Sequence, residues 1–177
     1  MSERLRTGVL VVALMALGAC GFEPLYGQGT ASGAAQLSGI RVAPIDDRIG
    51  QQLRNELRGY LTPHGLNDVP EWELRVELEE SISEVLVEET SFATRADLTV
   101  RAKFRIVSLG DQPLSVPAAT TSAIGSYNLL EATNEYANVV AERDARAKAI
   151  RVVARDIARQ IAIWLRDEPW KKIDQAT

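Results

Sequence analysis

Cysteine and histidine are almost absent from this chain, which has one of each, Cys20 and His64, among 177 residues. A single cysteine excludes an internal disulfide and a cysteine-rich metal cluster, and a single histidine excludes a metal site built on a histidine pair. No run reaches the ~18 consecutive apolar residues of a membrane-spanning helix. The net charge of −4 disfavours nucleic acid as a partner. These absences point away from an enzyme. The length and the 46% apolar residues fit one domain with its own core.

The first 19 residues have the pattern of an export signal. Arg4 and Arg6 form a basic start, and an uncharged apolar stretch follows from Val9 to Leu17. This is the organisation of a secretory signal peptide, and the apolar stretch is too short for a stable transmembrane anchor. We therefore expect residues 1–19 to be removed.

The end of this signal predicts a lipid anchor. Leu17-Gly18-Ala19-Cys20 resembles the bacterial lipobox, in which the cysteine becomes the acylated first residue. The alternative, a leftover thiol behind an ordinary signal peptide, would leave a reactive cysteine unexplained. Gly21 stands where aspartate would, by resemblance to enterobacterial sorting rules, retain the protein at the inner membrane. We expect N-acyl and S-diacylglycerol groups on Cys20, no other cofactor, and a location on the periplasmic side of the outer membrane.

Composition divides the mature chain into three parts. Residues 20–36 form an acylated flexible tether, because the stretch from Gly27 to Gly39 is rich in Gly, Ser, Ala and Gln. Residues 37–167 carry the periodic patterns of a single α+β domain. Residues 168–177 form a C-terminal tail after the last helix.

The first half of the domain predicts a strand, a helix and a second strand. The strand lies within residues 37–45. The helix begins at an N-cap at Asp46-Asp47 and continues to Leu61, with apolar residues at three- and four-residue spacing. The second strand, from Trp72 to Val87, alternates apolar and charged residues. Its apolar positions change from even to odd numbers, which predicts a bulge near Ser81–Ser83.

The second half predicts two more strands and a long helix. Residues 96–106 alternate without interruption, and a turn at Gly110–Pro113 leads to a fourth strand at about Ser115–Ser126. The final helix spans about Thr133–Arg166. Its apolar stripe is expected at the following positions: Tyr136, Val140, Ala147, Ile150, Val153, Ala154, Ile157, Ile161, Trp164 and Leu165.

The order β-α-β-β-β-α predicts an α+β fold. We expect a two-layer sandwich in which two amphipathic helices pack on one face of a four-stranded, mainly antiparallel sheet. The other face of the sheet would carry mostly polar side chains.

The acidic pairs of the sequence do not predict a catalytic site. They are Asp46-Asp47, Glu79-Glu80 and Glu88-Glu89. Neighbours on a strand face opposite ways, and capping or turns explain the other pairs. No phosphate-binding loop or nucleophile elbow is present. A tethered hydrolase, with Glu77, Asp97 or His64 as its essential residue, is therefore the weakest hypothesis.

A row of cations on the third strand is the best candidate binding surface. Arg95, Arg101, Lys103 and Arg105 share its outward face, and alternate positions are ~7 Å apart, which suits a polyanion such as lipid phosphates. The alternative, which we weigh equally, is cross-strand ion pairing with glutamates at 73, 77 and 79, worth ~0.2–1 kcal/mol per pair. A second row, Arg151, Arg155 and Arg159, is interpreted as a solvated helix face.

Several segments resemble the LPS-assembly lipoprotein LptE family in its alphaproteobacterial form, and together they span most of the mature chain. The mature start is Cys20-Gly21-Phe22-Glu23-Pro24-Leu25-Tyr26-Gly27. The first strand and helix match at Val42-Ala43-Pro44-Ile45, Asp47-Arg48-Ile49-Gly50-Gln51 and Leu53-Arg54-Asn55. The last strand-to-helix junction matches at Ser126-Tyr127-Asn128, Glu135-Tyr136-Ala137-Asn138 and Ala141-Glu142-Arg143-Asp144-Ala145.

The resemblance implies an α/β fold and two partners. One is the outer-membrane β-barrel LptD, which the lipoprotein plugs and helps to assemble. The other is lipopolysaccharide (LPS), which the complex delivers to the outer leaflet. Only Cys20 matches a functional position of the family. A different hypothesis, an auxiliary lipoprotein of a phospholipid-transporting ABC system, stays open at this point.

Overall fold

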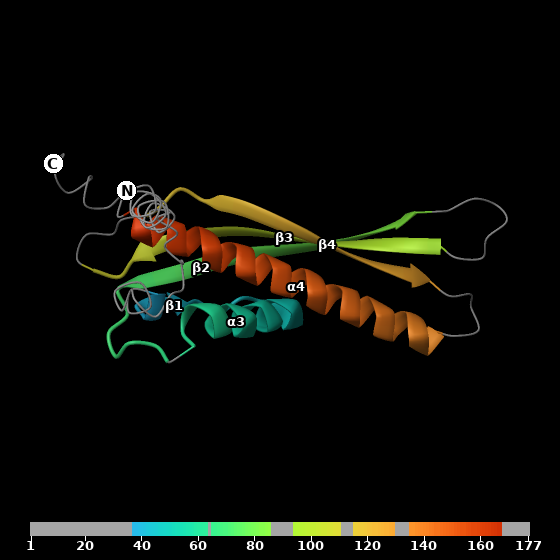
Figure 1. Ribbon diagram of the computed structural model, residues 1–177, viewed down its shortest axis with the longest axis horizontal. Coiled ribbons are helices and arrows are strands. Elements are labelled where there is room, and N and C mark those ends of the chain that lie inside the picture. Colours follow the sequence, from blue (N-terminus) through green and yellow to red (C-terminus); the bar gives the residue numbers. More distant parts are fainter. Residues whose placement is uncertain (1–36, 64, 86–93, 111–114, 130–134, 168–177) are drawn as a thin grey trace, which may run out of the picture. The chain divides into compact units, whose positions relative to one another are not determined.

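The computed structural model describes residues 37–63, 65–85, 94–110, 115–129 and 135–167 (Figure 1). All of these residues lie within one compact unit of the chain. The signal peptide, Cys20, the tether, His64, the turn at Glu88-Glu89 and the C-terminal tail lie outside the described residues. The elements follow the predicted order: β1 (Ile40–Val42), α3 (Asp47–Leu61), β2 (Trp72–Val85), β3 (Thr94–Ser108), β4 (Ala119–Leu129) and α4 (Glu135–Arg166).

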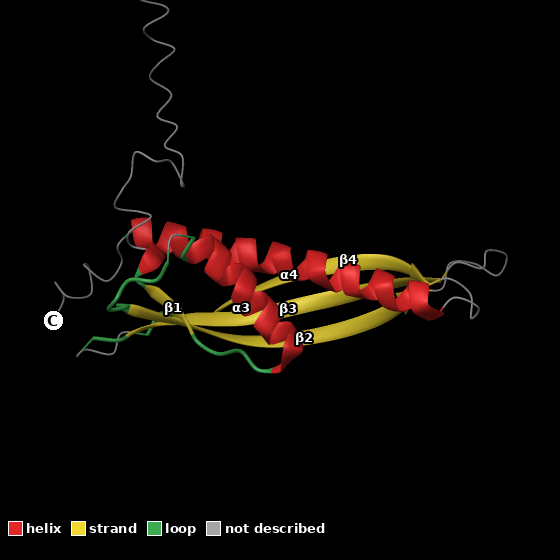
Figure 2. Cartoon of the chain, turned by 90° about the horizontal axis from the view of Figure 1, so that it is seen from below, coloured by secondary structure: helices red, strands yellow, loops and turns green. Residues whose placement is uncertain are grey.

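The four strands form one mixed sheet in the order β1-β2-β3-β4. β1 pairs with β2 in parallel, and α3 makes the crossover between them, whereas β2, β3 and β4 pair antiparallel. Both helices lie on the same face of this sheet (Figure 2). The predicted α+β architecture is therefore confirmed.

The core lies between this sheet face and the two helices. Even-numbered residues of β2 and β3 face the helices because successive side chains of a strand point to opposite faces. At one end of the core, Trp72 and Trp164 meet edge to face with ring centroids 5.1 Å apart. The fully buried large side chains are Ile40, Leu53, Leu57, Leu61, Leu74, Leu98, Val100, Ile150, Val153, Ile157 and Ile161.

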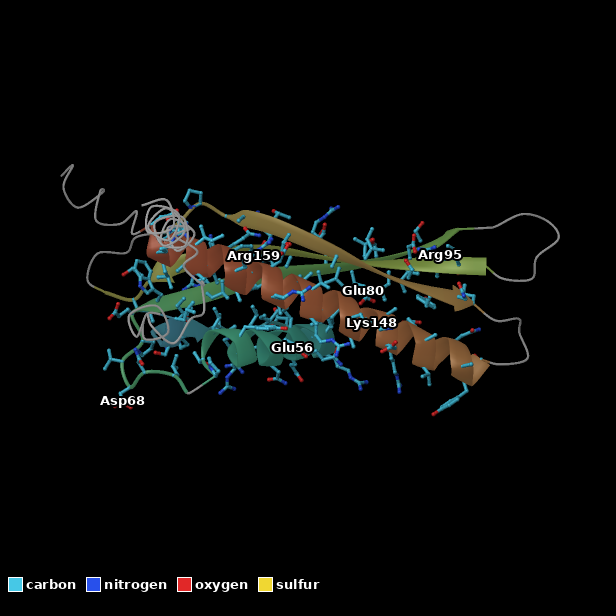
Figure 3. The ribbon with its side chains drawn as sticks, viewed as in Figure 1. Glu56, Asp68, Glu80, Arg95, Lys148 and Arg159 are labelled. Carbon is cyan, nitrogen blue, oxygen red and sulfur yellow. The ribbon has the colours of Figure 1, made fainter. Side chains whose placement is uncertain are left out.

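The predicted bulge at Ser81–Ser83 is wrong. The β2–β3 register continues without a shift from Trp72, opposite Ser108, to Val85, opposite Arg95. Glu80 therefore lies on the helix side of the sheet, where Arg146 of α4 donates to it through Nε at 2.7 Å and Nη2 at 2.8 Å (Figure 3). The ion pair allows a charged side chain at a core-facing position, so the apolar pattern is interrupted although the backbone is regular.

Two predicted strands have different ends in the structure. β1 is limited to Ile40–Val42. Beyond it, the N–H of Ala43 still donates to the carbonyl of Leu74. Pairing stops there because the next residue is a proline without an N–H. β4 begins at Ala119, and Ser115 makes only an isolated bridge with Val107. Pro117 lies between that bridge and β4, where it cannot donate to the ladder.

The predicted apolar stripe of α4 is too long at its N-terminal end. Tyr136 is 80% exposed, Val140 is 44% exposed and Ala147 is exposed, and α4 has no buried residue before Ala145. On the neighbouring end of β2, the helix side carries Glu80, which is in an ion pair, and Ile82, which is 46% exposed. The core-facing part of α4 is therefore shorter than the helix.

Helix α4 crosses β4 at a glycine. A Cβ atom built on Gly125 would overlap the carbonyl oxygen of Ala145 and lie 2.8 Å from its carbonyl carbon. Both are backbone atoms of α4, so no side chain could move aside to make room. Gly125 thus sets the distance between the helix and the edge strand.

We predict that Gly125→Ala lowers the free energy of unfolding by about 1–3 kcal/mol, because the methyl group must displace the α4 backbone. The measurement is urea unfolding of the detergent-solubilised protein, followed by circular dichroism. Gly59→Ala is the matched control, since a Cβ there meets nothing within 4 Å, and it should stabilise α3 by roughly 0.5–1 kcal/mol. Equal effects of the two substitutions would contradict the close approach.

Candidate functional site

The candidate site is the open face of the sheet, opposite the helices. α4 packs on β3 and β4, and α3 packs on α4 and β1, so both helices lie on the side of the buried even-numbered residues of β2 and β3. Odd-numbered residues of β2 and β3 and even-numbered residues of β4 form this face, as the register requires. Most of these side chains are charged or hydroxyl-bearing, so the sheet is apolar on one face and polar on the other.

A buried carboxylate organises one end of this face. Glu73 is 8% exposed. It accepts hydrogen bonds from Arg41 (Nη2, 2.5 Å) and from Arg75 (Nε, 2.8 Å). The hydrogen bond from Arg75, followed by that from Arg41, holds the pKa of Glu73 below its usual value. Because Arg41 lies opposite Glu73 in the parallel register, the cluster also joins β1 to β2.

The central part of the predicted cation row faces acidic residues but does not pair with them. Lys103 lies opposite Glu77, and Arg101 lies opposite Glu79. No ion pair within the described part of the chain involves Arg101, Lys103 or Arg105. Glu73, the third candidate partner, pairs with Arg41 and Arg75 instead. The ion pairs considered as an alternative are therefore not formed here, although the glutamates still reduce the local positive potential.

Two arginines are register partners where the cation row of β3 approaches the start of β2. Arg75 lies directly opposite Arg105, and like charges in this position destabilise a sheet. A hollow of about 220 Å³ lies here, with charged lining residues Arg75, Glu77, Lys103 and Arg105. Three cations and one carboxylate give this hollow a net positive charge, which an anion would offset.

Arg95 does not belong to this group. It lies six residues before Arg101 on β3, about 20 Å along the strand, at the end labelled in Figure 3. Its guanidinium donates to Asp97 at 3.3 Å and to the Ser126 hydroxyl at 2.8 Å. A hydrogen bond from Ser126, and then Arg95, lowers the pKa of Asp97. Arg95 is thus engaged in a local polar network.

Arg75 is the residue of this site that sequence reasoning missed. It has the same strand periodicity as Glu73 and Glu77, but its proximity to Arg105 depends on the register between β2 and β3. The alternation of the sequence could place it on the outward face. The alternation could not show which residue of the next strand lies opposite Arg75.

The other residues considered for chemistry are dispersed in the structure. Glu79 lies on the open face and Glu80 on the helix side, as the strand periodicity predicts. Arg151, Arg155 and Arg159 are exposed on α4, and Arg159 pairs with Asp156. Within the described residues, no three His, Cys, Asp or Glu side chains gather as metal ligands, and no helix is long and apolar enough to cross a membrane.

Solved structures that share this fold include two lipoproteins. A putative lipoprotein from Caulobacter crescentus CB15 is 22% identical with a TM-score of 0.59, and the match covers 78% of this chain and 98% of that chain. A minor lipoprotein from Acinetobacter baumannii is also 22% identical, with a TM-score of 0.55, and the match covers 71% of this chain and 92% of that chain. No curated protein matches the sequence.

The family comparison covers nearly the whole described domain. The model of the family described as "LptE: Lipopolysaccharide-assembly" matches residues 37–163. This range includes all six described elements except the last residues of α4. The chain therefore belongs to the LptE family of lipopolysaccharide-assembly lipoproteins.

Proposed function

We propose that this chain is the lipoprotein subunit of the outer-membrane LPS translocon, where it plugs the LptD barrel, assists its assembly and helps deliver LPS to the outer leaflet. The family match over residues 37–163 carries the proposal. Nothing in this role requires a catalytic step, and we assign none.

The two faces of the sheet suit a protein that works inside a barrel. The lumen of such a barrel is polar and wet, so an insert needs a sealed core of its own and a hydrophilic outside. Here α3 and α4 cover the apolar face, and charged side chains populate the open one. The domain can therefore enter a polar lumen without exposing its core.

The barrel proposal is tested by purification from detergent-solubilised outer membrane. Tagged full-length lipoprotein should bring down LptD in a stable complex, because plugging demands a lasting contact. An unrelated tagged lipoprotein of similar abundance is the control. Recovery of the lipoprotein without any large β-barrel would overturn the proposal.

The proposed anchor is the lipid on Cys20. We predict that Cys20→Ala moves the protein from the membrane fraction to the soluble periplasmic fraction, because the acyl chains supply ~0.8 kcal/mol per buried methylene. Fractionation and metabolic labelling with palmitate measure the change. Continued labelling of the variant would refute acylation at this position.

The proposed LPS contact is the hollow and its cation row. LPS phosphates are polyanionic, and Arg101, Lys103 and Arg105 have no carboxylate partner among the described residues that an incoming phosphate would have to displace. Arg75, which is paired with Glu73, adds a fourth cation on the next strand. Arg95 stays a predicted contact at the far end of the row.

We predict that Arg101→Glu with Lys103→Glu weakens LPS binding about tenfold or more, equivalent to ~1.4 kcal/mol, by reversing two charges beside the hollow. Binding is measured with purified LPS and the detergent-solubilised protein. Arg151→Glu with Arg155→Glu, on the exposed face of α4, is the control and should bind as the parent does. A variant that unfolds instead would assign Arg101 and Lys103 a structural role.

A further inference from the structure

The outer edge of β4 lacks the features that normally prevent strands from pairing with other chains. β4 is the last strand of the sheet and contains eleven residues, Ala119–Leu129, none of them charged and none of them proline. Exposed edges are usually kept short or carry lysine, proline or a bulge. The opposite edge, β1, follows this rule with three residues, one of which is Arg41. β4 does not.

Helix α4 adds an apolar margin beside this edge. Asp156 accepts a hydrogen bond from Thr121 of β4 at 3.0 Å, which identifies the side of α4 that faces β4. Val152 and Ile163 lie four residues before and seven residues after Asp156, on the same side of the helix. They are 40% and 39% exposed. Figure 3 shows Arg159, which pairs with Asp156, at the margin of α4 beside β4.

We propose that the β4 edge and the margin formed by Val152 and Ile163 together bind an extended segment of the barrel partner as a fifth strand. Backbone hydrogen bonds to β4 would supply affinity, and alternate side chains would supply specificity. The segment should be uncharged. Its apolar residues would face Val152 and Ile163. On the open face, its other side chains would lie beside Thr120, Ser122 and Ser126 and beside Ile124, which is 65% exposed.

The geometry of α4 disfavours a second copy of this chain in the same position. Paired strands lie ~4.8 Å apart, whereas packed helices need 8–10 Å between their axes. The Ala145 carbonyl lies directly over Gly125, so two copies joined through the middle of β4 would force their α4 helices together. A segment without a covering helix meets no such obstacle.

That the bound segment belongs to the barrel rests on the proposed function. The experiment is designed to distinguish failure of strand docking from failure of the proposed function. Full-length Val152→Glu/Ile163→Glu and parent proteins are each co-expressed with LptD, and the complex is quantified after purification. We expect about a tenfold loss of complex in the variant, because two charges replace the apolar margin. The control is Val139→Glu/Val140→Glu on the same helix, where the side chains are 41% and 44% exposed. It should change the yield by no more than about twofold.

Hydrogen exchange of the parent protein provides a readout that does not depend on the stability of a variant. The N–H groups of residues 119–129 that point away from β3 should exchange about tenfold more slowly in the complex than in the free lipoprotein, since strand addition gives them hydrogen-bond partners. Unchanged exchange in a formed complex, or equal yields from the two double variants, would overturn strand docking while leaving the proposed function intact. Failure of the parent to bind LptD would overturn both. A dimer of the lipoprotein that is lost in the Val152→Glu/Ile163→Glu variant would also overturn strand docking, because a second copy would then occupy the β4 edge.

Discussion

The structure depends on a sheet that buries only one of its faces. In β2 and β3 the alternation of apolar and charged residues assigns one face to water and the other to α3 and α4. The two helices cover the apolar surface of that single face, and its burial stabilises the fold by ~25 cal/mol per Å² of apolar area. The same alternation leaves the second face available for polar contacts, so stability and the candidate binding surface come from one periodic pattern.

The open face is a structured surface and not a uniform layer of solvated charge. At one position Glu73 satisfies two arginines and is itself almost completely covered. Two residues further along β2, Arg75 lies opposite Arg105, and no carboxylate pairs with both of them. Arg75 shares Glu73 with Arg41, whereas Lys103 and Arg105 have no ion-pair partner among the described residues, so the lining of the hollow has a net positive charge. Arg95, in contrast, is hydrogen-bonded to Asp97 and Ser126. An anionic ligand would therefore meet different conditions along a single strand.

The two edges of the sheet differ for reasons that also concern function. β1 is short, and the Arg41–Glu73 pair holds it to β2. β4 is long and uncharged, and α4 passes over it so closely that only glycine fits at position 125. An edge so exposed in a protein of the envelope family LptE is consistent with a strand that is completed by another chain.

Periodicity in the sequence was enough to predict the element order, the division of the sheet into two faces and the outward direction of Arg101, Lys103 and Arg105. These properties are local, because a period of two or of 3.6 residues is written into consecutive side chains. Long-range pairing was not visible in the same way. Arg146 lies 66 residues from Glu80, and only their meeting explains why an interrupted apolar pattern needs no bulge. The exposed start of α4 and the juxtaposition of Arg75 with Arg105 likewise depend on which surfaces come together. The chain alone thus determined its local periodic structure, whereas the tertiary fold decided which charges are paired, because pairing depends on distance in space and not on spacing along the sequence.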